Sequence, residues 1–301
     1  MKTQINEKYF DFIGKGSFGD VYKIDDKAIK IFKLEDIKER IKDKYYTNEI
    51  TDEVKREYEN YLKGIIKEVE NMKICSNKNE YSVKCYDYFK NEKILGIIME
   101  YCDNNLKQIL KSRKKGFNIE EIYEIMYQLN ETFKIMKKNN IVHRDIKLEN
   151  ILVKYDNNNN ILNFICKLSD YGISKRLNDF TICKTYTGTV TTMAPEILKA
   201  EEEEIKEYSD KCDLWSIGVI IYELYFKKPP YNGINASAIL KLIKNNGQKL
   251  LQKTGYYPLD NLIENLLIEN PLKRISCDEY FNHLFFKDEI KLIYKLEGKK
   301  D

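Results

Sequence analysis

The chain has 301 residues, of which 43% are hydrophobic and 33% are charged. This length is sufficient for one large domain or two moderate domains with a substantial hydrophobic core. The formal net charge is only +3, because 51 basic residues are nearly balanced by 48 acidic residues. Such a balance argues against a nucleic-acid partner that is bound through bulk neutralisation of phosphates.

The cysteine pattern and the apolar stretches indicate the cellular compartment in which the protein is expected. Seven cysteines are scattered and never spaced as CxxC, so neither a disulfide framework nor a zinc site is expected, and a reducing compartment fits best. The first ten residues are too polar for a signal peptide. The longest apolar stretch, residues 214–226, is too short to span a bilayer. We therefore expect an intracellular, cytoplasmic protein with no membrane partner.

The front of the chain alternates between strand-like and helix-like segments. In the first 35 residues, apolar and aromatic side chains surround a glycine cluster, and the run KAIKIF alternates as in a half-buried strand. Residues 34–75 carry many charges and apolar residues at helical spacing, and residues 81–101 return to a strand-like pattern. These patterns predict strands, then a charged helical segment, then strands again.

The rest of the chain is predominantly helical. Residues 120–139 carry apolar side chains at helical spacing, and a helical remainder begins at residue 208. Between these segments, the apolar runs 151–153 and 161–168 flank a run of asparagines, which predicts a β-hairpin with a polar tip. A strand-rich front and a helix-rich back predict two lobes with a seam near residues 100–105.

A glycine-rich run near the N-terminus is a candidate phosphate cradle. The sequence GKGSFGDV, residues 14–21, lies between strand-like segments, and glycines let backbone amides approach phosphates without interference from a Cβ atom. Taken alone, the run is equally typical of an ordinary hairpin turn. Lys30 alternates with apolar residues in AIKI, and a lysine at such a position usually just points at solvent.

The later motifs are more specific, and they occur in a fixed order. They are HRDIKLEN at 143–150, DYG at 170–172, APE at 194–196, DLWSIG at 213–218 and NPLKR at 270–274. With the glycine-rich run and Lys30 before them, residues 9–287 closely resemble the eukaryotic-type serine/threonine protein kinase family. Because all the signatures arrive in order, chance agreement is negligible.

This resemblance implies the fold and the reaction. The fold would be α+β and bilobal, with a small β-rich N-lobe that contains one main helix and a larger helical C-lobe. The kinase domain would cover residues 9–287, with the N-lobe at about 9–101, the C-lobe at about 105–287 and a C-terminal tail at 288–301. The resemblance also implies ATP as the phosphoryl donor, Mg²⁺ as a cofactor and proteins as substrates.

It further implies catalytic roles for the polar residues of the motifs. Asp145 would orient the substrate hydroxyl or accept its proton, and Asn150 and Asp170 would hold the magnesium ions. Lys147 resembles the lysine that meets the transferred phosphoryl group in serine/threonine kinases, whereas tyrosine kinases usually differ there. The residues implied to hold the nucleotide are Gly14, Lys15, Gly16, Ser17, Phe18, Gly19, Val21, Ala28, Lys30, Glu100, Cys102 and Leu152, with Met99 at the back of the pocket.

Lys30 matches the lysine that contacts the α- and β-phosphates and pairs with a helix glutamate. We assign that partner as Glu68, because Ile65 and Val69 give it an apolar flank that can pack between the lobes. The competing glutamates lie in the most polar part of the same segment: Glu49, Glu53, Glu57 and Glu59. In the back of the chain, Arg274 is expected to pair with Glu196 in a buried bidentate salt bridge.

Two features depart from the family pattern. Tyr171 replaces the commoner phenylalanine of the DFG motif, so its hydroxyl needs a partner if the ring is buried. The stretch between Lys30 and Glu68 is longer than usual, and the surplus around residues 39–61 is either an extended helix or a docking surface. We favour the extended helix, because runs of charge are usually solvated faces.

Regulation and substrate choice are also suggested by position. Thr185 lies at the spacing where similar kinases place an activating phosphothreonine, which would pair with Arg144. Glu149 and Glu223 resemble the acidic pair that grips an arginine before the phosphoacceptor in basophilic kinases. Thr189 resembles the threonine that bonds near the catalytic aspartate and, like those glutamates, is assigned to substrate binding.

Two other classes of protein share parts of this pattern. A pseudokinase scaffold would lack at least one of Lys30, Asp145, Asn150 and Asp170, and all four are present. A small-molecule kinase of related fold would lack the APE segment and its downstream arginine. We therefore expect an active protein kinase.

Overall fold

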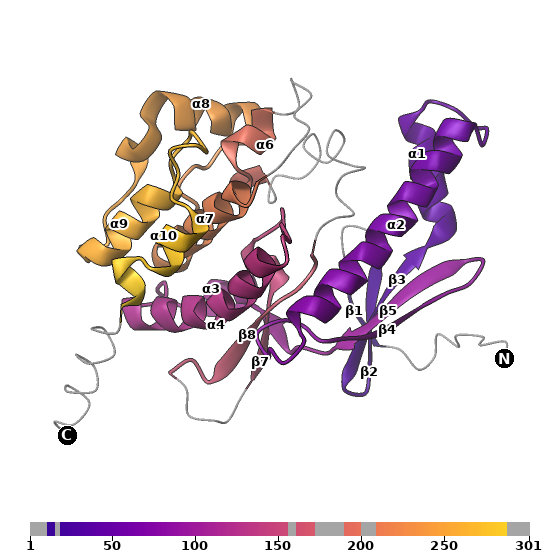
Figure 1. Ribbon diagram of the computed structural model, residues 1–301, viewed down its shortest axis with the longest axis horizontal. Coiled ribbons are helices and arrows are strands. Elements are labelled where there is room, and N and C mark those ends of the chain that lie inside the picture. Colours follow the sequence, from indigo (N-terminus) through magenta and orange to yellow (C-terminus); the bar gives the residue numbers. More distant parts are fainter. Residues whose placement is uncertain (1–10, 16–18, 156–160, 172–189, 200–208, 288–301) are drawn as a thin grey trace.

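The computed structural model describes residues 11–15, 19–155, 161–171, 190–199 and 209–287 of the chain (Figure 1). Five of the residues assigned above to the nucleotide, to regulation or to the substrate lie outside these ranges: Gly16, Ser17, Phe18, Thr185 and Thr189.

The front of the chain forms an antiparallel sheet of five strands in the order β1-β2-β3-β5-β4. The strands are β1 Asp11–Lys15, β2 Asp20–Ile24, β3 Lys27–Lys33, β4 Cys85–Lys90 and β5 Ile94–Glu100. In β3, the buried residues are Ala28, Lys30 and Phe32. Because successive side chains of a strand point to opposite faces, Lys30 lies on the buried face and not on the solvent face.

Two helices occupy the charged segment between β3 and β4. Helix α1 covers Leu34–Lys44 and helix α2 covers Asp52–Cys75. The chain turns between them at Tyr46, whose φ of 51° is left-handed, and the Thr51 side chain caps α2 by accepting a hydrogen bond from the backbone N–H of Val54. The segment therefore does not form the single extended helix that we favoured. Helix α2 is the main helix of this lobe, and α1 packs against it (Figure 1).

The back of the described chain is mainly helical. Its α-helices are α3 Leu106–Ser112, α4 Ile119–Lys138, α6 Pro195–Lys199, α7 Lys211–Phe226, α8 Ala236–Asn246, α9 Tyr257–Leu266 and α10 Cys277–Phe281. Its 3₁₀ turns are η2 Leu148–Asn150, η4 Val190–Thr192, η5 Gly247–Leu250 and η6 Leu284–Phe286. All residues of α7 from Cys212 to Leu224 are buried, so this helix forms the centre of the lobe. In the ranges described here, no helix combines the length and the apolar composition that crossing a membrane requires.

A second, small sheet lies at the junction of the two parts. Strands β7 (Ile151–Tyr155) and β8 (Phe164–Leu168) pair antiparallel, which confirms the predicted hairpin, and β6 (Asn104–Asn105) adds to the edge of β7. Figure 1 places this sheet between the large sheet with α1 and α2 and the group of helices α6 to α10. The arrangement is the predicted α+β, bilobal fold.

Candidate active site

A pocket of about 710 Å³ opens between the two lobes. Strands of the large sheet line one side, and η2, β7 and the residues that follow β8 line the other. Among its lining residues are Gly14, Lys15, Val21, Ala28, Lys30, Met99, Glu100, Cys102 and Leu152, all of which were assigned to nucleotide binding. Gly19 does not line the pocket, but a Cβ atom at this position would lie 2.5 Å from the carbonyl oxygen of Ile31, so the close approach to β3 requires glycine.

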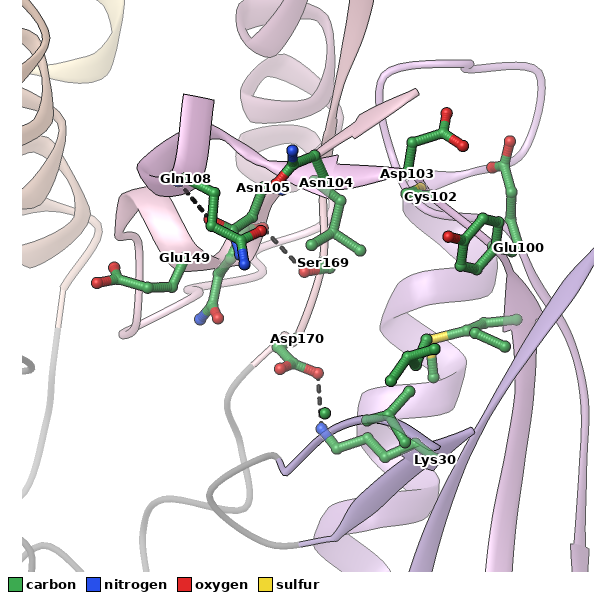
Figure 2. Close-up of a pocket in the computed structure, with 18 of the residues that line it drawn as sticks. Lys30, Glu100, Cys102, Asp103, Asn104, Asn105, Gln108, Glu149, Ser169 and Asp170 are labelled. Atoms are coloured by element: carbon green, nitrogen blue, oxygen red, sulfur yellow. Dashed lines mark hydrogen bonds and ion pairs between the residues drawn. The ribbon is translucent and has the colours of Figure 1, made fainter. Parts of the chain in front are cut away.

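Lys30 links three elements within this pocket. Its Nζ atom lies 2.6 Å from Oδ1 of Asp170 and 3.5 Å from Oε1 of Glu68, so the implied pairing with Glu68 is present. Figure 2 shows Lys30 and Asp170 facing each other across the pocket. Burial by itself would lower the pKa of Lys30, but attraction to the carboxylates of Asp170 and Glu68 is stronger and raises the pKa above its ordinary value. The side chain therefore stays cationic.

Helix α2 presents Glu68 to Lys30 because its neighbours bury one face of the helix. Ile65, Val69 and Met72 are almost completely buried, and Glu68 lies among them with an exposed fraction of 1%. These positions follow the helical spacing of three and four residues. The apolar flank that led us to choose Glu68 thus corresponds to the buried face of α2.

Asp170 lies just after β8, at the floor of the pocket. The low-dielectric surroundings of the cleft favour the neutral acid, but the ammonium group of Lys30 holds the pKa of Asp170 below its ordinary value. The carboxylate is therefore ionised at neutral pH. Its side chain keeps an exposed fraction of 41%, so the oxygens remain accessible from the pocket.

The catalytic-loop residues form a compact polar group opposite the large sheet. The Nδ2 group of Asn150 donates to the carbonyl oxygen of Asp145 and to its Oδ2, both at 2.9 Å. Nζ of Lys147 lies 3.0 Å from the same Oδ2 atom. Because Asp145 is only 8% exposed, these contacts fix the direction in which its carboxylate can act.

Asp213, at the start of α7, holds the backbone of this loop. Its Oδ2 accepts the backbone N–H of His143 at 2.7 Å and its Oδ1 accepts that of Arg144 at 2.8 Å. Arg144 needs this support because its backbone is left-handed, with a φ of 65°. Asp213 was assigned no role from the sequence, although a carboxylate at the start of a largely apolar helix is a signal that could have identified it.

The carboxylate of Glu100, at the end of β5, is paired with two lysine side chains. It accepts a hydrogen bond from Nζ of Lys154 at 2.9 Å and lies 3.3 Å from Nζ of Lys167. The ammonium groups outweigh the opposing effect of burial, so the pKa of Glu100 is lowered. Because this carboxylate is already paired with lysines, what Glu100 offers to the pocket is its backbone.

The two glutamates assigned to substrate binding have different surroundings. Glu149 is exposed and lines the pocket. Glu223 is 5% exposed, and its carboxylate pairs with the ammonium group of Lys107 from α3. The described residues that line the pocket do not include Glu223. The structure therefore does not place both carboxylates at the rim of the same cavity.

The predicted pair in the helical lobe is confirmed. Nη1 and Nη2 of Arg274 donate to Oε1 and Oε2 of Glu196 at 2.7 Å and 2.9 Å, in the expected bidentate geometry. The Arg274 side chain is fully buried and lies against the ring of Trp215. This pair anchors α6, which begins within the APE motif, to the core around α7.

The hydroxyl of Tyr171 also has the partner that its burial requires. Tyr171 is 1% exposed, and its hydroxyl lies 2.6 Å from Oγ of Ser82. Its ring packs against that of His143, with the two ring centres 5.2 Å apart. Tyrosine is thus accommodated at this position without an unsatisfied polar group.

Comparisons with known proteins agree with this geometry. The model of the protein kinase domain family matches residues 8–286. Serine/threonine-protein kinase atg1 of Dictyostelium discoideum is 32% identical over 90% of this chain and 38% of its own length. Calcium-dependent protein kinase 4 of Plasmodium falciparum is 29% identical over 94% of this chain and 50% of its own. Serine/threonine-protein kinase 33 of Bos taurus is 32% identical over 74% and 46%.

The chain spans half or less of the length of these curated relatives. The match to the family model nevertheless covers almost all of this sequence, and the ion pairs described above join its motifs in space. The chain belongs to the protein kinase domain family, among the eukaryotic-type serine/threonine protein kinases.

Proposed function

We propose that this protein transfers the γ-phosphoryl group of ATP, with Mg²⁺, to serine and threonine hydroxyls of protein substrates. The observation that carries the proposal is that two polar clusters reach the same pocket, one through Lys30 and Asp170 and the other through Lys147 and Asn150. On one side, Lys30 joins Glu68 and Asp170. On the other, Asn150 and Lys147 hold the carboxylate of Asp145.

The pocket fits a nucleotide in size and in chemistry. A volume of about 710 Å³ lies within the usual range for small-molecule sites. Val21, Ala28 and Leu152 supply apolar surface for a base, and the buried cation of Lys30 supplies a counter-charge for phosphates. A base and a phosphate chain need these two environments within one cavity.

The donor set also fits magnesium bound together with phosphates. Mg²⁺ commonly takes one or two protein oxygens and completes its octahedron with phosphate oxygens and water. Asp170 provides an ionised carboxylate and Asn150 an amide oxygen, and both residues line the pocket. Within the described ranges, no group of three or more His, Cys, Asp or Glu side chains is gathered to hold a metal. When bound, the metal would neutralise charge on the phosphates.

The roles of the remaining residues follow from their contacts. Asp145 would orient the substrate hydroxyl and accept its proton, because Asn150 fixes its carboxylate and leaves it acceptor capacity. Lys147 lies beside that carboxylate and would stabilise negative charge on the transferred group. Lys30 would hold the phosphates, while Glu68 keeps the lysine on the pocket side of β3.

The experiment is a phosphorylation assay with Mg·ATP and a mixture of generic protein substrates. Wild-type protein should phosphorylate serine and threonine, and Asp145→Asn should lower turnover by about 10²–10⁴-fold, because positioned acid–base help is lost. Asp103→Asn is the matched control, since Asp103 also lines the pocket but belongs to neither cluster, and its side chain accepts a hydrogen bond from the backbone N–H of Tyr155. If the wild type has no Mg-dependent turnover, the proposal fails.

Activation by phosphorylation of Thr185 forms part of this proposal, although that residue lies outside the described ranges. Its support is that Arg144 directly precedes Asp145 and has a constrained backbone, so an anion bound there would act on the catalytic loop. We would compare wild type and Thr185→Ala after autophosphorylation and again after phosphatase treatment. Equal rates in all four samples would remove Thr185 from the mechanism.

A preference for basic residues before the phosphoacceptor is the remaining part. Glu149 is exposed at the rim of the pocket and can meet a guanidinium group. Glu223 is already paired with Lys107, so a substrate arginine would have to displace this lysine. We therefore propose a basic preference that depends mainly on Glu149 and is weakened by Lys107.

A further inference from the structure

Asp170 has a backbone conformation that its neighbours must hold. Its φ of 53° lies in the left-handed region, which an aspartate tolerates but does not prefer. On its N-terminal side, Ser169 is fixed, because its N–H and its hydroxyl both donate to the carbonyl oxygen of Asn150 at 2.9 Å. Nε2 of His143 lies 2.9 Å from the carbonyl oxygen of Ser169. On the C-terminal side, the described residue next to Asp170 is Tyr171.

Tyr171 is held by its hydroxyl as well as by packing. The hydroxyl lies 2.6 Å from Oγ of Ser82, and both residues are 1% exposed. Burial raises the pKa of Tyr171 well above its ordinary value, so the hydroxyl keeps its proton and can donate. The other polar group beside it is the thiol of Cys75, and sulfur is a weak hydrogen-bond partner.

The backbone around Ser82 connects it to the strand that carries Asp170. The N–H of Val83 donates to the carbonyl oxygen of Leu168 at 2.9 Å, and the N–H of Leu168 donates to that of Tyr81 at 3.0 Å. The hydroxyl of Thr132, on α4, donates to the same Tyr81 oxygen at 2.9 Å. The segment between α2 and β4 is therefore fixed to the end of β8 and to the helical lobe, and it presents Oγ of Ser82 at a defined place.

From this geometry we infer that Ser82 is a positioning residue for the metal–nucleotide site. Its hydrogen bond keeps the ring of Tyr171 seated against His143, and the seated ring holds Asp170 in the left-handed conformation that directs its carboxylate to Lys30. A phenylalanine ring needs no such partner, whereas a tyrosine ring leaves a buried hydroxyl unsatisfied if the partner is lost. The inference rests on the proposed function, because it takes Asp170 as a ligand of Mg²⁺.

The test is a double-mutant cycle read by calorimetric binding of Mg·ADP. In Ser82→Ala the Tyr171 hydroxyl has no strong partner, so the conformation in which its ring packs against His143 is less populated. The Mg·ADP dissociation constant should then rise about tenfold. Tyr171→Phe alone should also weaken binding, because it leaves the Ser82 hydroxyl unpaired. The double variant Ser82→Ala/Tyr171→Phe removes both polar groups and should return to within about twofold of the wild type.

A matched control separates this role from a general loss of stability. Ser216 is also a buried serine, 6% exposed, whose hydroxyl donates to the carbonyl oxygen of Thr192 at 2.8 Å. Ser216→Ala should lower the melting temperature and leave the Mg·ADP dissociation constant unchanged. ADP binding without Mg²⁺ should change much less in Ser82→Ala than Mg·ADP binding does, because Asp170 acts through the metal.

The outcomes are distinguishable. Recovery of Mg·ADP affinity in the double variant supports the inference when Ser216→Ala loses stability and keeps its affinity, since a general loss of stability then does not account for the weaker binding of Ser82→Ala. If Ser82→Ala binds Mg·ADP as the wild type does, or if the double variant is at least as weak as Ser82→Ala, the inference is overturned while the proposed function stands. If the wild type does not bind nucleotide in a Mg-dependent way, both fail.

Discussion

The ion pair of Arg274 in the helical lobe and the Lys30 cluster in the cleft are both buried, but their hydrogen-bonding capacity is used differently. Arg274 is 2% exposed and donates to both oxygens of Glu196. Its remaining N–H groups reach the backbone carbonyl oxygens of Ile268, Glu269 and Lys211. Every donor direction of the guanidinium group is thus occupied by protein.

Lys30 is buried to a similar degree, with 6% exposed, yet within the described ranges its ammonium group is not surrounded by acceptors in the same way. One carboxylate, that of Asp170, lies within hydrogen-bond distance of Nζ at 2.6 Å, and that of Glu68 lies farther away at 3.5 Å. The Asp170 side chain is 41% exposed to the cleft. The difference teaches that a buried charge whose hydrogen bonds are all made within the protein stabilises the fold. A buried charge whose partner faces a pocket is available to a ligand.

The largest expected effect is on stability, from Arg274→Met. Removing one member of a buried ion pair leaves the other uncompensated, so the free energy of unfolding should fall by about 3–5 kcal/mol. Urea denaturation of wild type and variant measures this loss. Adding Glu196→Leu should recover part of it, because no unpaired carboxylate then remains. A loss below about 1 kcal/mol, the scale of an exposed pair, would contradict the comparison.

The second prediction concerns activity and uses Lys30→Met. We expect phosphorylation to fall by about 10²–10³-fold, the scale for losing one electrostatic stabiliser of the reacting group. Because Lys30→Met removes the cation beside the buried carboxylate of Glu68 as well as that beside Asp170, turnover is measured per folded molecule. Lys33→Met is the control, since Lys33 is an exposed lysine of the same strand. Comparable turnover in Lys30→Met and Lys33→Met would show that Lys30 is no more available to a ligand than an exposed lysine.

A smaller effect is expected for the Lys107–Glu223 pair. This pair is intermediate between the Arg274–Glu196 pair, which is fully hydrogen-bonded, and the Lys30 cluster, which faces the pocket. Glu223 is buried, but the Lys107 side chain is 42% exposed, so a charged substrate can replace this lysine. In Lys107→Met, the ratio of kcat/KM for arginine-containing over arginine-free peptides should rise about tenfold, since a hydrogen bond to a charged group contributes about 1.5–3 kcal/mol. Lys111→Met, an exposed lysine of the same helix, is the control. An unchanged ratio would remove Glu223 from substrate recognition.

Much of this could be predicted from motif order, and the remainder depends on contacts between distant residues. The Lys30–Glu68 and Arg274–Glu196 pairs were predictable because the resemblance pairs those residues and because their neighbours are apolar. The Lys107–Glu223 contact was not, since it depends on how α3 packs against α7. The break between α1 and α2 was missed because the charge pattern continues through it, and only the cap at Thr51 marks a new start.

The partner of Tyr171 illustrates the same limit. That a buried tyrosine hydroxyl needs a partner follows from chemistry alone. That the partner is Ser82 follows only from the bridge between residues 81–83 and Leu168, which joins parts of the chain far apart in sequence. Local patterns predict which groups must be satisfied, and the tertiary structure determines which residue does so.

The smallest expected effect is a pH dependence of stability caused by His283. Both ring nitrogens of this residue of the helical lobe have hydrogen-bond partners within the protein. Its Nε2 lies 3.0 Å from Oδ1 of Asn261, and its Nδ1 accepts the backbone N–H of Phe285 at 3.2 Å. A protonated ring cannot accept that bond. Burial, with a smaller contribution from the ammonium group of Lys287, lowers the pKa of His283 below its ordinary value.

The sign follows from proton uptake. As the pH falls below about 6.5, the ordinary histidine pKa, the unfolded chain binds a proton before the folded protein does. The free energy of unfolding therefore decreases through this range and levels off below the folded pKa. The wild type should lose stability relative to His283→Gln between pH 7.5 and more acidic values, and His143 cancels because both proteins contain it. Turnover per folded molecule should be the same in both. A stability difference that does not vary with pH would show that His283 is not the group that titrates.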